Sequence, residues 1–239
     1  MRRNTLLIRS KGGRINIHPI ENSVSRVNYV SQGKMDPQLL TYYDQEAERL
    51  CAKYESANMS LMHAWLVEVI PKGCSILELG CGSGREAAFL HSKGYKVFAT
   101  DGSKGILRQA MSIHPELKGL VSRLTIPAAF PFKDLSFESV LAIGVLMHLQ
   151  GNDVQLTFEE VSRVLAASGV FVFSIPGSRD DLDANGRDAG GRKYTFLSES
   201  RWTDLLKAVG LRLVQKRESR DSLGRAGIAW VTYVAEKVI

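Results

Sequence analysis

The sequence predicts an α/β protein, a mainly parallel sheet with helices on both of its faces. Short apolar stretches of the kind that form buried strands alternate along the chain with amphipathic stretches of helical period. That alternation favours parallel pairing, because each intervening helix carries the chain back over the sheet. Two late apolar stretches follow one another without a helix between them, which predicts an antiparallel hairpin at the edge of the sheet.

The first helices are expected directly after position 35. Four residues share one face at helical spacing and predict an amphipathic helix from Asp36: Tyr43, Ala47, Leu50 and Tyr54. A second helix is expected over 60–70, where the chain reaches Pro71 and Gly73, residue types that end helices.

Strands and helices then alternate to the end of the chain. In order, we expect a strand over 75–79, a glycine loop and a helix to 93, a strand over 96–100, a helix over 104–113, strands over 120–126 and 139–145, a helix over 154–165 and a strand over 170–174. Residues 177–193 combine glycines with dense opposite charges and are expected to form a loop. A helix over 198–209 and strands over 211–216 and 228–235 complete the series.

The net charge of +6 comes entirely from the beginning of the chain. Residues 1–34 hold seven basic residues and one acid, so the remainder is neutral. A basic arm can bind nucleic-acid phosphates without sequence preference, although a solvated tail, or sequence upstream of a start at Met35, is the simpler interpretation. We therefore expect a flexible basic arm over 1–34 and a single domain over 35–239, with a helical lid over 35–72.

Composition and cysteine usage predict a cytoplasmic protein. No apolar stretch approaches the roughly 18 residues that a membrane span needs, and the apolar patch near the start is too short for a signal peptide. The three cysteines form an odd set without CxxC spacing, which favours reduced thiols. No His, Asp or Glu cluster has metal-ligand spacing, so no metal site is predicted.

The strongest chemical signal is a glycine loop between a strand and a helix. Gly80, Gly82 and Gly84 follow the strand that ends at Glu78-Leu79, and such a loop lets the backbone approach a ligand closely. Asp101 ends the next strand, where a carboxylate can accept both hydroxyls of a ribose. The pattern therefore predicts a nucleotide-type cofactor, although NAD would require glycine or alanine at the position of Arg85.

Four stretches resemble the successive motifs of class I S-adenosylmethionine-dependent methyltransferases. They are ILELGCGSGREAAFL (76–90), VFATDGS (97–103), FPFKDLSFESVLAIGVLMHL (130–149) and VLAASGVFVFSIP (164–176). The glycine loop that continues into Gly-Arg-Glu is most similar to that of bacterial small-molecule methyltransferases. The resemblance spans roughly residues 38–239 and implies a doubly wound, Rossmann-like, seven-stranded sheet, mostly parallel with an antiparallel last strand.

The resemblance also implies which residues contact the cofactor. Glu78 and the glycine loop would surround its methionine part, and Asp101 its ribose. An acid that often contacts adenine is missing near Ile126, so adenine would be held by apolar and backbone contacts around Pro127 and Ala128. The full expected set is Tyr43, Glu78, Gly80, Cys81, Gly82, Gly84, Arg85, Asp101, Gly102, Pro127, Ala128, Ile143 and His148.

Two residues are candidates for a direct role in catalysis. Tyr43, with Tyr42 beside it, lies in a helix that folds over the cofactor in this family, and it could line the methyl group; its alternative is a plain core position. His148 follows the fourth strand and could act as a general base, or it could cap the next helix or line the cofactor. Arg85 could pair with the cofactor carboxylate or stabilise the start of its helix.

The acceptor site is expected near the late loop and hairpin. Its candidate residues are Tyr42, Arg187, Arg192, Tyr194 and Arg225. Several arginines together would suit an acidic or phosphate-bearing acceptor, whereas a solvated loop with surface ion pairs is the alternative for each residue singly.

The sequence thus predicts an enzyme that transfers a methyl group from S-adenosylmethionine to an oxygen or nitrogen of a small molecule, leaving S-adenosylhomocysteine. Two alternatives remain: an RNA methyltransferase that uses the basic arm, and a protein that binds the cofactor without catalysis.

Overall fold

The computed structural model describes residues 9–10, 13–14 and 35–238 of the 239-residue chain. Of the basic arm, it contains the short antiparallel pair β1 (Arg9–Ser10) and β2 (Gly13–Arg14). The expected flexibility of residues 1–34 concerns residues that otherwise lie outside the described part of the chain.

The main sheet has seven strands in the order β5-β4-β3-β6-β7-β9-β8. Their bounds are Ser75–Leu79 for β3, Lys96–Asp101 for β4, Val121–Arg123 for β5, Phe137–Ile143 for β6, Leu165–Arg179 for β7, Leu211–Arg220 for β8 and Ile228–Lys237 for β9. Strands β3 to β7 pair in parallel, and β9 runs antiparallel to both β7 and β8. The expected mostly parallel sheet with an antiparallel last strand and an edge hairpin is confirmed.

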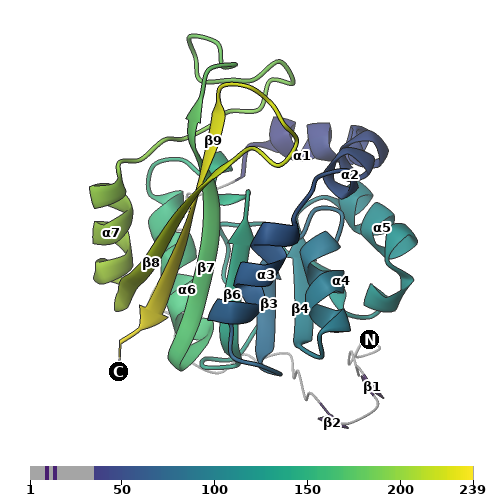
Figure 1. Ribbon diagram of the computed structural model, residues 1–239, viewed down its shortest axis with the longest axis vertical. Helices are drawn as coiled ribbons and strands as arrows, with labels where there is room; N and C mark the ends of the chain where they lie inside the picture. Colours follow the sequence, from purple (N-terminus) through teal and green to yellow (C-terminus); the bar gives the residue numbers. More distant parts are fainter. Residues whose placement is uncertain (1–8, 11–12, 15–34, 239) are drawn as a thin grey trace, which may run out of the picture.

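Helices cover both faces of this sheet (Figure 1). They are α1 (Pro37–Gln45), α2 (Ala47–Glu55), α3 (Ser60–Val69), α4 (Arg85–Ser92), α5 (Lys104–Ile113), α6 (Asp153–Val164) and α7 (Glu199–Ala208), with the 3₁₀ turns η1 (Pro115–Leu117) and η2 (Leu146–His148). In Figure 1, α3 and α4 lie in front of the sheet and α6 lies behind it. No helix in the described part of the chain is both long and apolar enough to span a bilayer.

The two faces of the sheet are buried in separate apolar clusters. One contains Phe158 of α6 and Trp202 of α7 packed on Phe171 and Phe173 of β7. The other joins α3, α4 and α5 to alternate residues of the same strands, with Leu66 fully buried. Neighbouring side chains of a strand point to opposite faces, so one continuous apolar strand supplies both clusters.

Four elements differ most from expectation at their ends. The first helix is divided at Glu46, whose backbone leaves helical geometry, so α1 and α2 point in different directions. Strand β5 covers only 121–123, because the chain turns inward after Arg123 and lines the cavity described below. Strands β7 and β8 extend to Arg179 and Arg220, beyond their expected ends.

Helix α1 is held over the carboxyl end of β4. The Asp44 carboxylate accepts hydrogen bonds from the Ser103 hydroxyl (2.6 Å) and the Gly105 amide (2.8 Å) at the start of α5. A side chain at Gly105 would collide with the Asp44 backbone oxygen, at 2.7 Å. This close contact brings Tyr42 and Tyr43 above the sheet edge.

The structure shows the burial and bonding of the three cysteines. Cys51, Cys74 and Cys81 are buried and form no disulfide. That agrees with reduced thiols, while a cytoplasmic location remains a prediction.

Candidate functional site

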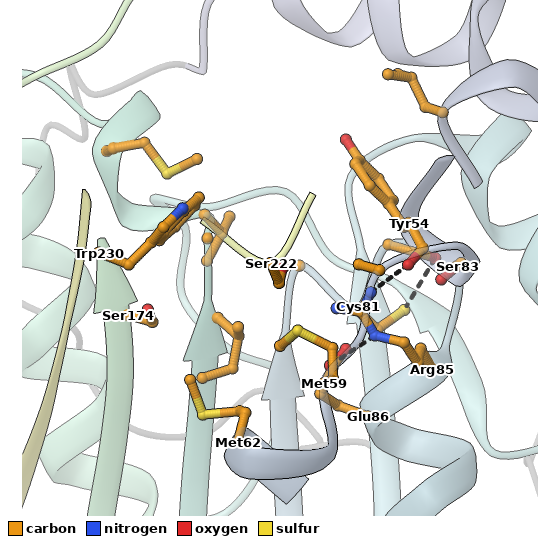
Figure 2. Close-up of a pocket in the computed structure, with 18 of the residues that line it drawn as sticks. Tyr54, Met59, Met62, Cys81, Ser83, Arg85, Glu86, Ser174, Ser222 and Trp230 are labelled. Carbon is orange, nitrogen blue, oxygen red and sulfur yellow. Dashed lines mark hydrogen bonds and ion pairs between the residues drawn. The ribbon is translucent and has the colours of Figure 1, made fainter. Parts of the chain in front are cut away.

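A cavity of about 680 Å³ opens at the carboxyl ends of the parallel strands. In Figure 2, Tyr54, Cys81, Ser83 and Arg85 lie on one side of it and Trp230 on the other. Met59 and Met62, from the start of α3, form part of the wall between them (Figure 2). The volume falls within the roughly 300–1,000 Å³ typical of small-molecule and cofactor pockets.

The glycine loop forms the floor of this cavity. Its backbone adopts conformations that disfavour side chains, so the backbone itself is presented to the cavity. Gly80 has φ +69°, and a Cβ there would lie 2.7 Å from the Val145 side chain. The Cys81 amide donates to the Thr100 carbonyl oxygen at 2.8 Å, which fixes the loop to β4. Gly80, Cys81 and Gly82 line the cavity, whereas Gly84 is turned towards Leu117 and does not.

Asp101 lies buried beside the glycine loop. Its Oδ2 accepts from the Gly82 amide at 3.2 Å and its Oδ1 from the Ser103 amide at 2.9 Å. Burial raises the pKa of the Asp101 carboxyl to about 6, although the backbone hydrogen bonds oppose the shift. Each carboxylate oxygen keeps a further acceptor site, and Gly102 also lines the cavity.

Glu78 supplies a second buried carboxyl group at the end of β3. Its Oε2 has no hydrogen-bond partner among the described residues, although the residue is 1% exposed. Burial, with a smaller contribution from the Glu86 charge, raises the pKa of Glu78 well above its ordinary value. An unpaired buried oxygen in a cavity wall is suited to a polar ligand group that would satisfy it.

Arg85 connects the loop to the helices above it. Its guanidinium donates to the Tyr54 backbone oxygen and, at 2.8 Å, to Glu86 Oε1 (Figure 2). Arg85 lines the cavity, and these two partners already hold its charge in place.

The cavity wall that follows β5 is mainly apolar and, among the described residues, contains no acidic residue that could contact adenine. Leu124, Thr125 and Ile126 line the cavity together with Ile106 of α5. Pro127 and Ala128, the positions expected from the sequence, are not in the lining, and Ala128 is exposed.

Tyr43 and His148 meet in the centre of the cavity wall. The Tyr43 hydroxyl lies 3.0 Å from His148 Nε2, and His148 Nδ1 lies 3.1 Å from the Lys193 carbonyl oxygen. A carbonyl oxygen only accepts, so Nδ1 carries the proton and Nε2 accepts from the tyrosine. Burial lowers the pKa of His148 to about 4, so the imidazole is neutral at pH 7.

The charged loop after β7 folds back over this pair. Arg192 donates from Nε (2.9 Å) and Nη2 (2.6 Å) to Asp188 Oδ2, and from Nη1 to the Tyr43 hydroxyl at 3.4 Å. Tyr194 donates to Asp188 at 3.2 Å. The rings of Tyr42, Tyr43 and Tyr194 lie 5.3, 5.8 and 5.9 Å from the Arg192 guanidinium.

The remaining acceptor-site candidates divide between the cavity and its surroundings. Arg192, Tyr194 and Arg225 line the cavity, and Ile143 lines it from the end of β6. Tyr42 lies behind Arg192, with its hydroxyl accepting from Arg49 at 3.1 Å. Arg187 is outside this cavity and donates to the Gly191 backbone oxygen at 2.6 Å.

The β8–β9 loop supplies a further anchored group. Asp221 accepts from Arg225 Nη2 at 2.6 Å and from the Trp230 indole nitrogen at 2.9 Å. Burial opposes these bonds, yet they lower the pKa of Asp221 to about 2. The indole plane of Trp230 is thereby fixed in the cavity wall, opposite the glycine loop (Figure 2).

Several lining residues were not predicted as site residues. The helical spacing of Tyr54 indicates a core position on the first helix and not a site residue. Met59 and Met62 belong to no recognisable sequence motif. Arg179 lines the cavity and pairs with Asp181, and Asp188, which lies outside the lining, pairs with Arg192.

Comparison with known proteins assigns the central part of the chain to a family. Residues 77–173 match the model of the methyltransferase domain. This segment, 97 of the 239 residues, is similar to methyltransferase domains. The resemblance drawn from the sequence is confirmed for this segment, together with its enzyme class and S-adenosylmethionine as its cofactor.

One curated relative and two solved structures give the context of this methyltransferase domain. The chain is 29% identical over 146 residues to a malonyl-[acyl-carrier protein] O-methyltransferase of Methylovorus sp. (strain MP688), covering 59% of this chain and 48% of the relative. The chain therefore spans about half the length of that relative.

The solved structures agree in fold. The 1,6-didemethyltoxoflavin-N1-methyltransferase of Burkholderia thailandensis, with bound 1,6-didemethyltoxoflavin and S-adenosylhomocysteine, has a TM-score of 0.69 at 17% identity and covers 92% of this chain and 94% of that one. The [4+2]-cyclase SpnF has a TM-score of 0.62 at 14% identity, covering 84% and 96%. One fold thus accompanies different activities, so the acceptor must be argued from the site.

The residues of the methyltransferase domain suit its cofactor. The unpaired Glu78 oxygen, the free acceptor sites of Asp101 and the exposed backbone of the glycine loop all face one cavity. Its wall at Leu124 and Ile126 offers apolar contacts for a base.

Proposed function

We propose that the chain transfers a methyl group from S-adenosylmethionine to an oxygen or nitrogen of a small-molecule acceptor. The observation that carries the proposal is the continuity of the cavity. Its lining includes the glycine loop and Asp101 as well as Tyr43, His148 and Arg192. A cofactor and an acceptor would therefore share one cavity.

In this proposal the cofactor is held by residues of three strand ends. Asp101 accepts the ribose hydroxyls, Glu78 and the backbone of Gly80 and Gly82 hold the methionine part, and Ile126 contacts the base. When bound, S-adenosylmethionine supplies an activated methyl group. The protein then has to align donor and acceptor and to exclude water, which can provide most of the acceleration of such a reaction.

Tyr43 and His148 serve this alignment. The imidazole Nε2 is engaged by the Tyr43 hydroxyl, and the pKa of about 4 makes His148 a weak base at neutral pH. We assign His148 the role of orienting Tyr43, which lines the cavity and whose hydroxyl it holds. This arrangement favours acceptors that are nucleophilic without strong base assistance.

A small acceptor is favoured over RNA by the shape and lining of the cavity. The wall opposite the glycine loop contains the anchored Trp230, and Met59 and Met62 form part of the wall between them (Figure 2), a lining that suits a compact organic molecule. The name of the Burkholderia relative includes a small-molecule acceptor, which supports the same choice. The RNA alternative depends on the basic arm over residues 1–34, most of which lies outside the described residues.

The test is transfer of labelled methyl groups from S-adenosylmethionine to separated acceptor pools. We expect label in dialysable metabolites with the intact protein, and none with Asp101→Ala. Asp204→Ala, which changes an exposed acid on α7, is the matched control and should keep activity. Label only in RNA would support the RNA alternative, and binding of S-adenosylhomocysteine without transfer to any pool would support a non-catalytic role.

A further inference from the structure

Arg192 has more hydrogen-bonding capacity than its neighbours use. Its side chain is 14% exposed and lines the inner part of the cavity. A guanidinium group carries five N–H donors. Among the described residues it makes three hydrogen bonds, two to Asp188 and a long one of 3.4 Å to the Tyr43 hydroxyl. The outer edge of the guanidinium therefore keeps donors for a ligand.

The charges around Arg192 leave room for another anion. Arg179 is 5% exposed and lies 3.9 Å from the same Asp188 oxygen that Arg192 binds. Arg179 donates to Asp181 from Nε at 2.8 Å and from Nη2 at 2.6 Å, so the two guanidinium groups have two carboxylate partners, of which only Asp188 is buried. A carboxylate at the outer edge of Arg192 would satisfy the buried N–H donors that these partners leave unused.

The histidine and tyrosine side chains nearest to Arg192 carry no negative charge at neutral pH. His148 is neutral, and burial raises the pKa values of Tyr43 and Tyr194, so both keep their hydroxyl protons. Lys53 of α2 lines the same cavity, where burial and the positive charges of Arg225 and Arg192 lower the pKa of its ammonium group. The carboxylates of Asp181, Asp188 and Asp221 balance three of the four cations Arg179, Arg192, Arg225 and Lys53, so one positive charge remains among these groups.

An apolar surface adjoins these charged groups. Trp230 is fixed by its hydrogen bond to Asp221, and its ring lies about 3.5 Å from where a Cβ at Gly144 would be. Met147, next to His148 in the chain, lines the cavity on the same side.

We propose that the acceptor is an organic acid whose carboxylate binds the outer edge of Arg192 while its apolar body lies against Trp230 and Met147. A carboxylate fits because its two oxygens can accept from neighbouring N–H groups of one guanidinium. The inference rests on the proposed methyl transfer and names the acceptor class for that site.

The test compares acids with their uncharged amides. The probes are benzoate and benzamide, phenylacetate and phenylacetamide, and 3-phenylpropanoate and 3-phenylpropanamide, titrated calorimetrically into protein saturated with S-adenosylhomocysteine. At least one acid should bind about 10- to 100-fold more tightly than its amide, the range expected for a charge-assisted hydrogen bond. Arg192→Gln should abolish that preference, and Arg212→Gln, at an exposed arginine of β8, should retain it.

Arg192→Gln leaves Asp188 with its bonds from the Gly190 and Arg192 amides and the Tyr194 hydroxyl, so the loop should stay folded. Thermal unfolding of each variant checks this, and Arg192→Lys, which keeps the charge, should retain part of the preference. Equal affinities for acid and amide in every pair, or an acid preference that survives in Arg192→Gln, would overturn the inference. Failure to bind S-adenosylhomocysteine would instead count against the proposed function, because the acid–amide comparison can also be made on the free protein.

Discussion

At the scale of single residues, the site depends on ionisable groups whose protonation is set by burial. Asp101 and Glu78 have raised pKa values because their charged forms lose hydration, and His148 has a lowered one for the same reason. Such groups can accept or donate to a ligand without carrying a permanent charge. The neutral imidazole in particular lets one nitrogen hold the Lys193 carbonyl oxygen while the other accepts from Tyr43.

The lowered pKa of His148 predicts a loss of stability in acid. Its pKa is about 4 in the folded protein and about 6.5 when unfolded, so between these values only the unfolded chain takes up the proton. Folding stability from this group is therefore present above pH 6.5 and is lost as the pH falls towards 4. The loss is at most about 3 kcal/mol, at about 1.4 kcal/mol per pKa unit.

Urea unfolding at pH 7.5 and pH 4.5 measures this contribution. His148→Gln should lose less stability than the unmodified protein between the two pH values, since the other titrating groups are shared. The same pH dependence in both proteins would show that the histidine is not held neutral.

The residue scale also shows how much of the site the sequence predicts. The cofactor half could be predicted because Glu78, the glycines and Asp101 lie at the ends of neighbouring strands, within 24 positions of one another. The acceptor half could not be predicted in detail, because its contacts join distant segments: Arg192 meets Tyr43 across 149 positions. Tyr43, His148 and Arg192 were nevertheless all candidates, and the structure brings them together.

At the scale of elements, buried strands were predictable and exposed ones less so. The central parallel strands are mainly apolar because both faces are covered, and the expected ranges agree closely with β3 and β4, whereas β7 extends beyond its expected range of 170–174 at both ends. Strand β8 forms the sheet edge and is exposed over 214–220, so its polar second half gives no strand signal. The division between α1 and α2 was missed because the apolar stripe continues across Glu46.

The glycine loop supports a prediction at this scale. Gly80→Ala adds a methyl group at 2.7 Å from Val145 and also forces a side chain into positive φ. We expect a loss of stability of about 1–3 kcal/mol and weaker cofactor binding, because the loop must shift to relieve the clash. Gly73→Ala is the matched control, since Gly73 has a similar φ of +71° but no atom within 4 Å of the added methyl group.

Chemical denaturation and titration with S-adenosylhomocysteine compare the two variants. Gly73→Ala should lose only the stability that a side chain costs at positive φ. It should bind S-adenosylhomocysteine as tightly as the unmodified protein does. Equal effects of both substitutions on binding would mean that contact with Val145 does not shape the loop.

At the scale of the whole molecule, the topology of the sheet determines where the site lies. Parallel strands present their carboxyl ends at one edge, and the glycine loop, Asp101 and Ile143 meet there. Helix α1 from the beginning of the described domain, and the β8–β9 loop from its end, close over that edge. In the proposed function, the cofactor and acceptor sites are adjacent because these distant segments fold together.

The most direct test of the central claim is calorimetric titration with S-adenosylmethionine and S-adenosylhomocysteine. The unmodified protein and Asp204→Ala should bind both saturably, and Asp101→Ala should bind at least tenfold more weakly, because it loses charge-assisted hydrogen bonds to the ribose. Thermal unfolding establishes that Asp101→Ala remains folded. Absence of binding by the unmodified protein, or unchanged affinity in Asp101→Ala, would contradict the assignment of this cavity to the cofactor.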